Sequence, residues 1–233
     1  MIKNPFNVLS KGELLLWIIS LMTVTTSFLF SPSKDFLTLT ASLIGVTALI
    51  FIARGHVFGQ ILSVIFAIFY GIVSFYFRYY GEMITYLGMS APIAGMSAIS
   101  WILHPYKDSE EVEVCHITKK QLIVLSVLTL IVTVMFYFIL KALGNANLIV
   151  SVISVTTSFV ASYLTFLRSH YYAVAYAIND IILIILWILA SVVNPDYIPM
   201  IMCFVMFLIN DLYGFYSWRK MLKRQGAGKK ENY

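Results

Sequence analysis

Residues 170–193 read HYYAVAYAINDIILIILWILASVV, an apolar run interrupted near its middle by Asn179 and Asp180. A hydrocarbon core roughly 30 Å thick is crossed by about 20 apolar residues of α-helix. The run is long enough to cross such a core, and Asp180 is the one residue among Asp, Glu, Lys and Arg that it contains. It therefore predicts a membrane-spanning helix that carries a carboxyl group near mid-membrane.

Seven further apolar stretches of similar length surround this run, separated by short polar segments. Sixty per cent of the 233 residues are apolar and 12% are charged, which a soluble domain of this size could not bury. The alternation typical of membrane β-strands is absent from the sequence. We predict a single all-α transmembrane domain over 1–233, with eight helices at 13–30, 37–53, 57–77, 82–103, 119–140, 148–167, 170–193 and 198–218.

Lysine and arginine are unevenly distributed between the two sides of this predicted bundle. Of the 16 basic residues, only Lys34, Arg78 and Lys141 fall opposite the N-terminal side, and a basic tail at 219–233 falls on that side. Loops rich in Lys and Arg stay in the cytoplasm. We therefore expect a multi-pass protein of the cell (inner) membrane with both termini cytoplasmic. Membrane lipid is the expected partner of the tail, and the net charge of +5 requires no nucleic-acid partner.

A short pattern recurs along the chain. The letters ARGH at 53–56 are echoed by LRSH at 167–170, 114 residues later, and each half ends in a tryptophan, Trp101 or Trp218. Such self-similarity is typical of transporters built from parallel repeats. The predicted organisation is an extra N-terminal helix (13–30), a three-helix repeat (37–103), a linker helix (119–140) and a second three-helix repeat (148–218).

Two Asn-Asp pairs, Asn179-Asp180 and Asn210-Asp211, lie inside predicted spans. A carboxylate at mid-membrane costs about 2.5–3.5 kcal/mol on insertion scales, so lipid-facing positions are excluded. The two helices run in opposite directions, and a rise of 1.5 Å per residue puts both Asp residues at a similar depth. We expect them to line one cavity and to bind ribose hydroxyls or a cationic ring. Hydrogen bonding between helices is the alternative role.

Aromatic residues share the helix face that carries Asp180. Tyr172, Tyr176 and Trp187 follow helical spacing there, and they could clamp a flat heterocycle. Tryptophans near helix ends more often anchor the chain at the membrane interface. That anchoring role is favoured for Trp101, Trp187 and Trp218.

Two other helices offer features suited to a cavity wall and to movement. In 57–77, Gln60 and Tyr70 lie on a face of small and polar residues, which suits either a cavity or close packing. In the next span, Pro92 between two glycines allows a kink or hinge. Glu82 begins this span on the outer side and is expected to be a solvated charge.

No catalytic or cofactor motif is recognisable in the sequence. The four histidines fall in loops or at helix ends without metal-ligand spacing, and the two cysteines imply no disulfide framework. A phosphate-binding Gly-rich loop and a nucleophile elbow are also lacking. We expect no cofactor, no metal and no enzymatic activity; a non-transporting scaffold is the remoter alternative to a transporter.

Three short motifs carry a resemblance to a known family. ARG at 53–55, YGEM at 80–83 and NDLYGFYSW at 210–218 resemble the PnuC family of vitamin transporters in order and in distance from the ends. The resemblance spans the second to the eighth predicted helix. It implies a three-plus-one-plus-three bundle related to the SWEET sugar carriers, with an added N-terminal helix, and a possible homotrimer.

The same resemblance implies a function. Members similar to this chain carry nicotinamide riboside by facilitated diffusion, and cytoplasmic phosphorylation traps the product. Relatives take thiamine, riboflavin or deoxynucleosides instead. Family members usually have two Trp and an Asn at the start of the seventh helix; here Asn179 matches the Asn, but Tyr172 and Ala175 stand at the Trp positions. The predicted substrate-binding residues are Gln60, Tyr70, Tyr172, Tyr176, Asn179, Asp180, Trp187, Asn210, Asp211 and Tyr213.

Overall fold

The computed structural model describes residues 5–31, 35–76, 80–107, 109–145 and 147–230. Within these ranges the eight predicted spans are confirmed, because eight helical segments are long and apolar enough to cross a membrane. The main helices are α1 (Lys11–Leu29), α2 (Phe36–Ala53), α3 (Val57–Tyr76), α4 (Tyr80–Thr85), α5 (Ala91–Leu103), α6 (Lys119–Ala142), α7 (Leu148–Phe166), α8 (Tyr172–Val193) and α9 (Ile198–Lys230).

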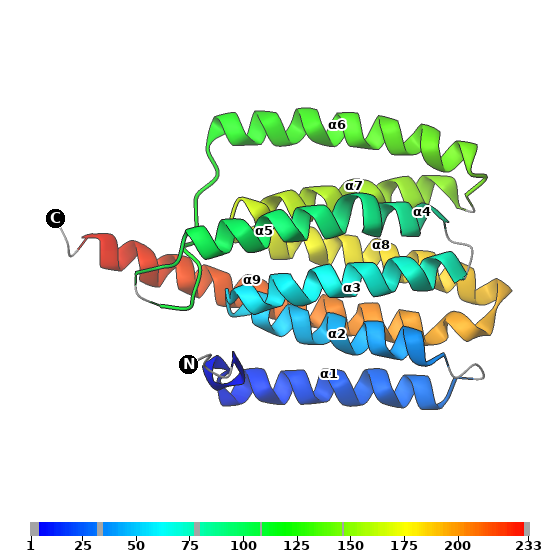
Figure 1. The fold of residues 1–233 in the computed structure, drawn as a ribbon, viewed down its shortest axis with the longest axis horizontal. Helices are drawn as coiled ribbons and strands as arrows, with labels where there is room; N and C mark the ends of the chain where they lie inside the picture. Colours follow the sequence, from blue (N-terminus) through cyan, green and yellow to red (C-terminus); the bar gives the residue numbers. More distant parts are fainter. Residues whose placement is uncertain (1–4, 32–34, 77–79, 108, 146, 231–233) are drawn as a thin grey trace.

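The helices lie side by side along one long axis (Figure 1). The turn between α2 and α3, the turn between α7 and α8, the described part of the connector between α5 and α6, the start of α1 and the end of α9 lie at the same end of the bundle, which we call the terminal end. Helix α2 packs against α3 and α9, and α7 packs against α5 and α8. Helices α1 and α6 lie on opposite outer sides of the bundle (Figure 1).

The fourth span is not a regular helix. Between α4 and α5 the chain forms a wide π-helical turn, η2 (Tyr86–Ser90), in which the Ala91 N–H bonds to the Tyr86 carbonyl. Proline has no N–H for the usual bond to the fourth preceding carbonyl, and its ring crowds that carbonyl. The predicted irregularity at Pro92 is therefore present as a wide turn just before it.

The last helix is longer than predicted. The sequence indicated a span ending at 218 and a basic tail, but α9 continues to Lys230. Met221 and Gln225 in this extension are each only 3% exposed. Gln225 bonds to the main chain of the connector at Val112 and Val114. Contacts with the connector thus stabilise a helix whose polar sequence gave no membrane signal.

Among the described residues, the basic residues that set the predicted orientation lie mostly at the terminal end. Lys11, Arg54, Lys119 and Arg168 lie at the terminal end, and Lys141 lies in the last turn of α6 at the opposite end. Three residues of the charge count, Lys3, Lys34 and Arg78, fall outside the described residues.

Candidate functional site

A small cavity lies in the middle of the bundle. Its volume is about 80 Å³, and helices α2, α3, α5, α7, α8 and α9 and the η2 turn form its walls. A second cavity of about 20 Å³ adjoins it toward the terminal end and shares Ile52, Ser63, Ala94 and Tyr176 with it. The polar and aromatic side chains around the two cavities are Gln60, Ser63, Phe66, Tyr86, Ser90, Ser97, Ser158, Ser162, Thr165, Tyr176, Asn179, Asp180, Phe204, Phe207 and Asp211.

Asp180 and Asp211 meet at this cavity, as the depth argument predicted. Asp180 is 2% exposed and Asp211 is 3% exposed, and both line this cavity with their carboxyl groups close enough to interact. Two carboxylates at such close range repel each other, and a proton or a cation beside them relieves that repulsion. Oδ2 of Asp180 is buried and has no hydrogen-bond partner among the described residues. The pair can therefore accept a further hydrogen bond or face a cation.

Amide and hydroxyl groups surround the acid pair. The Thr157 hydroxyl donates to Oδ1 of Asn179 at 2.8 Å, which fixes the orientation of that amide. The Tyr176 and Ser162 hydroxyls are 3.0 Å apart. Gln60 is 2% exposed, and its Nε2 has no partner within the described ranges. Buried polar groups are normally satisfied, so this wall has hydrogen-bonding capacity for a polar ligand or for water.

Another part of the cavity wall, which we call the aromatic wall, is formed by Phe66, Tyr86 and Phe207. The Phe66 ring lies 5.5 Å from that of Phe207 and 5.9 Å from that of Tyr86, centroid to centroid, in edge-to-face geometry. Gly45 makes room for this arrangement, because a Cβ added there would lie 2.3 Å from Cζ of Phe207. Aromatic faces beside a carboxyl pair can hold a flat cationic ring by cation–π attraction.

Sequence reasoning missed Phe66 and Tyr86. Both stand in apolar runs, where an aromatic residue facing a cavity cannot be told from one facing lipid. Pro92 was the one available signal for Tyr86, because a proline predicts an irregular turn just before it. That wide turn places Tyr86 and Ser90 on the cavity.

Five predicted site residues lie away from the cavity lining. Tyr172 packs on Trp218 at 4.7 Å, and Trp187 packs on Tyr197 at 5.6 Å, between ring centroids. Tyr70 lies behind the aromatic wall, 4.2 Å from Tyr86.

The other two, Asn210 and Tyr213, face α1. Asn210 donates to the Ser20 hydroxyl at 2.9 Å, and the Tyr213 hydroxyl donates to Oε1 of Glu13 at 2.9 Å. One residue along a helix turns the side chain by about 100°. Asn210 and Asp211 therefore point to different neighbours, one to α1 and the other into the cavity.

Two sequence-based expectations are wrong. Trp101, Trp187 and Trp218 are not interfacial anchors, because each is at most 1% exposed inside the bundle. Glu82 is not a solvated charge, because it is 4% exposed and close enough to Tyr70 and Tyr86 to interact with both electrostatically. In both cases other helices cover a helix end that the sequence alone suggests is free.

A polar and aromatic cavity at the centre of eight membrane-length helices is the arrangement of a small-molecule membrane transporter. Residues 35–220 match the family described as nicotinamide mononucleotide transporter. The chain belongs to this family, and the predicted resemblance is thereby confirmed.

Known relatives are similar over most of their length. The chain is 27% identical to the nicotinamide riboside transporter PnuC of Neisseria mucosa over 205 residues, which is 86% of this chain and 78% of that one. It is 24% identical to the transporter of the same name from Haemophilus influenzae, over 82% of each chain. A crystal structure described as that of the vitamin B3 transporter PnuC superposes with a TM-score of 0.81 at 25% identity, covering 93% of this chain and 94% of that one. The chain is thus an all-helical, multi-pass membrane transporter.

Proposed function

We propose that this protein carries nicotinamide riboside, or a closely related nucleoside-like vitamin, across the inner membrane by facilitated diffusion with metabolic trapping. The observation that carries the proposal is the Asp180–Asp211 pair lining one cavity together with an aromatic wall, inside a family transporter fold. Nicotinamide riboside combines a flat cationic ring with a hydroxylated sugar. The cavity offers a partner of matching chemistry for each part.

The lining favours a nucleoside over a nucleotide, although the family is described by a mononucleotide. Among the described residues, the two inner cavities are lined by the carboxyl groups of Asp180 and Asp211 and by no Lys, Arg or His. Phosphate groups are bound by Arg, Lys or helix N-termini. A phosphate dianion beside two carboxyl groups would be repelled, so a riboside suits the site better.

We assign the nicotinamide ring of the substrate to the aromatic wall, and its ribose to the part of the cavity lined by the Gln60 and Asn179 amides. Phe66, Tyr86 and Phe207 would face the pyridinium, with the acid pair balancing its charge. Gln60 and Asn179, with Tyr176, would take ribose hydroxyls. The cavities of about 80 and 20 Å³ are smaller than the roughly 300 Å³ of common ligand sites. Binding therefore requires side chains to move apart.

Thiamine or a deoxynucleoside is the second candidate. The residues at the family's two Trp positions are Tyr172 and Ala175, and Tyr172 packs on Trp218 outside the cavity lining. Without those indole rings, recognition of the substrate ring rests on Phe66 and its neighbours. A different flat heterocycle could fit that wall.

We also propose that the terminal end is cytoplasmic and that the protein assembles as a homotrimer. We further propose that two helix triplets are parallel repeats around the cavity. The first triplet is α2, α3 and the span formed by α4, η2 and α5, and the second triplet is α7, α8 and α9. Arg54, Lys119 and Arg168 at the terminal end support the orientation. The trimer follows from the resemblance alone, and chemical crosslinking in native membranes tests it.

Calorimetric titration of the purified protein with nicotinamide riboside, nicotinamide mononucleotide, thiamine and a deoxynucleoside tests the proposal. We expect nicotinamide riboside to bind and the mononucleotide to bind much more weakly. Binding of the deoxynucleoside alone would reject the cation site while leaving a nucleoside transporter. Binding of none of the four by folded protein would reject the substrate class.

A further inference from the structure

Trp101 and Trp218 pack together beyond the terminal end of the cavity. Trp101, in the last turns of α5, is 1% exposed; Trp218, in α9, is fully buried; and their ring centroids are 5.4 Å apart. The smaller inner cavity is lined by Ile52 and Thr165, whose carbonyls the two indoles contact. On the other side of the pair, Trp101 lines an open pocket of about 230 Å³ with His56 and Glu110. The tryptophan pair thus separates the inner cavity from the outer pocket.

The two indoles make equivalent, crossed hydrogen bonds. Trp101 Nε1 donates to the Thr165 carbonyl at the end of α7, at 3.1 Å. Trp218 Nε1 donates to the Ile52 carbonyl at the end of α2, at 2.8 Å. Each bond therefore joins the last helix of one triplet to the first helix of the other. Separation of the triplets at this end would break both bonds.

The turns that follow these carbonyls are also equivalent. Gly55 (φ 71°) and Arg168 (φ 57°) both adopt the left-handed conformation, and their N–H groups bond back to Ile52 and Thr165 at 2.8 and 3.0 Å. By these bonds, Gly55 in the first turn is the structural equivalent of Arg168 in the second. The match of the letters at 53–56 and 167–170 instead aligns Arg54 with Arg168, so the two alignments differ by one residue. Arginine in this conformation is strained where glycine is not.

The connector fastens both turns. The Val112 N–H bonds to the Gly55 carbonyl, and the Cys115 N–H bonds to the Arg168 carbonyl, each at 2.9 Å. The Arg168 guanidinium also donates to Sγ of Cys115 at 3.2 Å. We call residues 111–115 the strap.

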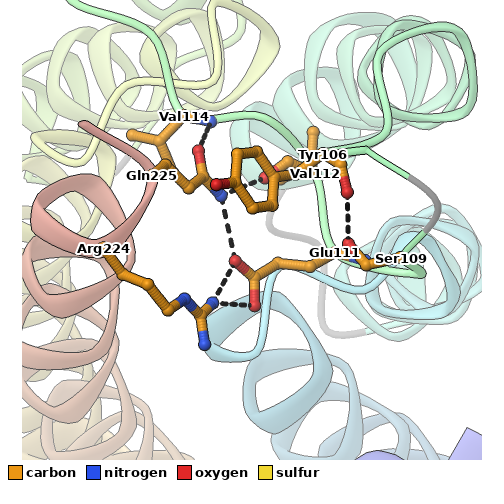
Figure 2. A network of polar contacts seen from close by, with 7 residues as sticks. All are labelled: Tyr106, Ser109, Glu111, Val112, Val114, Arg224 and Gln225. Atoms are coloured by element: carbon orange, nitrogen blue, oxygen red, sulfur yellow. Dashed lines mark hydrogen bonds and ion pairs between the residues drawn. The ribbon is translucent and has the colours of Figure 1, made fainter. Parts of the chain in front are cut away.

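The strap is in turn held by the extension of α9, as Figure 2 shows. Gln225 accepts from the Val114 N–H at 2.8 Å and donates to the Val112 carbonyl at 3.0 Å and to Glu111 at 2.9 Å. Arg224 pairs with the same carboxylate of Glu111. One segment of five residues is thus bonded to the first triplet, the second triplet and the end of α9.

We propose that Trp101 and Trp218 form the gate between the substrate cavity and the terminal-end solvent, and that the strap holds this gate shut. The inference rests on the proposed transport function. Opening the path at this end requires both indole bonds to break and the strap to release at least one turn. Tryptophan is suited to this role because one side chain supplies both the plug and the hydrogen bond.

Site-directed labelling tests the gate without any substrate. Ala94, which lines both inner cavities, is replaced by Cys in a Cys115→Ser, Cys203→Ala background, and a membrane-impermeant thiol reagent is added to one face of oriented vesicles. Loss of two buried hydrogen bonds in Trp101→Phe/Trp218→Phe should raise the labelling rate from the terminal end about tenfold or more. Labelling from the opposite face should not change.

Trp17→Phe is the matched control, because Trp17 bonds to the Thr47 hydroxyl at 3.0 Å, between α1 and α2. It should leave both labelling rates unchanged. If the double variant does not fold, the single Trp→Phe variants and Gln225→Ala each test one fastening, with an expected rise of roughly threefold.

Equal increases from both faces, or no increase in folded variants, would overturn the gate. Failure of nicotinamide riboside to bind would overturn the proposed substrate instead, because the labelling rates do not depend on it.

Discussion

The carboxyl groups of Asp180 on α8 and Asp211 on α9 lie beside each other on one cavity, at the centre of a bundle of membrane-length helices. Two acids this close at this depth are costly for folding. A compensating cation would relieve the cost, which makes the pair a recognition element for a positively charged ligand.

Asp180→Asn and Asp211→Asn should each weaken the binding of a cationic nucleoside by roughly 10- to 100-fold, because hydrogen bonds to charged groups contribute about 1.5–3 kcal/mol. Calorimetry on the purified variants measures the change. Asp196→Asn, in the short η3 turn (Pro195–Tyr197) away from the cavity, is the charge-matched control. Full affinity in both cavity variants would assign the pair a structural role.

Gly45→Ala should lower both stability and affinity. The new methyl group would lie 2.3 Å from Phe207 Cζ, and overpacking of this kind costs about 1–3 kcal/mol. Thermal unfolding in detergent and ligand titration measure the two effects. Gly95→Ala is the control, since no atom lies within 4 Å of its Cβ position, and it should be neutral or slightly stabilising. Equal behaviour of the two variants would contradict the packing at the aromatic wall.

Phe66→Leu should reduce the affinity for a cationic ring more than that for a neutral heterocycle of similar size. An aliphatic side chain keeps the apolar surface but removes the ring face, which contributes about 0.5–2 kcal/mol to cation binding. Titration of both ligands against Phe66→Leu gives the difference. Phe75→Leu, an exposed aromatic residue on the same helix, serves as the control. A uniform loss for both ligands would leave Phe66 as a packing residue.

Tyr213→Phe separates an anchoring role from a binding role. The phenol donates to the buried carboxylate of Glu13, so its removal should destabilise the protein by about 1–3 kcal/mol. Substrate affinity should be unchanged, because Tyr213 is not in the cavity lining. Glu13→Gln should lower the thermal stability in the same direction. A large loss of affinity without a loss of stability would return Tyr213 to the binding site.

Acidification should loosen the terminal end. Burial, with His116 and Arg219 nearby, lowers the pKa of His170 below its usual 6.5. The unfolded chain then binds the proton first, so the free energy of unfolding should fall as the pH drops through 6.5 toward the lower folded pKa. Unfolding curves of the wild type and His170→Gln at several pH values measure this slope. The variant should show the weaker dependence, and identical slopes would exclude His170 as its origin.

Much of the fold could be predicted from the sequence because lipid leaves the backbone few choices. Runs of about 20 apolar residues must be helices, and the contact between Asp180 and Asp211 followed from their depths. The partner of Asn210 could not be predicted, because one residue step decides whether a side chain faces the cavity or α1. Phe66 and Tyr86 carried no signal, since rings facing lipid and rings facing a cavity have the same apolar neighbours. The extension of α9 depends on contacts with the strap, which are distant in sequence.

Helix α1 has a mechanical consequence for transport. It packs against α2 and α9, and it bonds to α9 through Glu13 and Ser20, so it joins the two triplets along one seam. The other seam, between α5 and α7, has no such external brace among the described helices. Separation of the triplets should therefore be asymmetric, with a hinge along the side that α1 covers and the wider opening between α5 and α7. Trp101 lies on the opening side, and Trp218 lies on the hinge side.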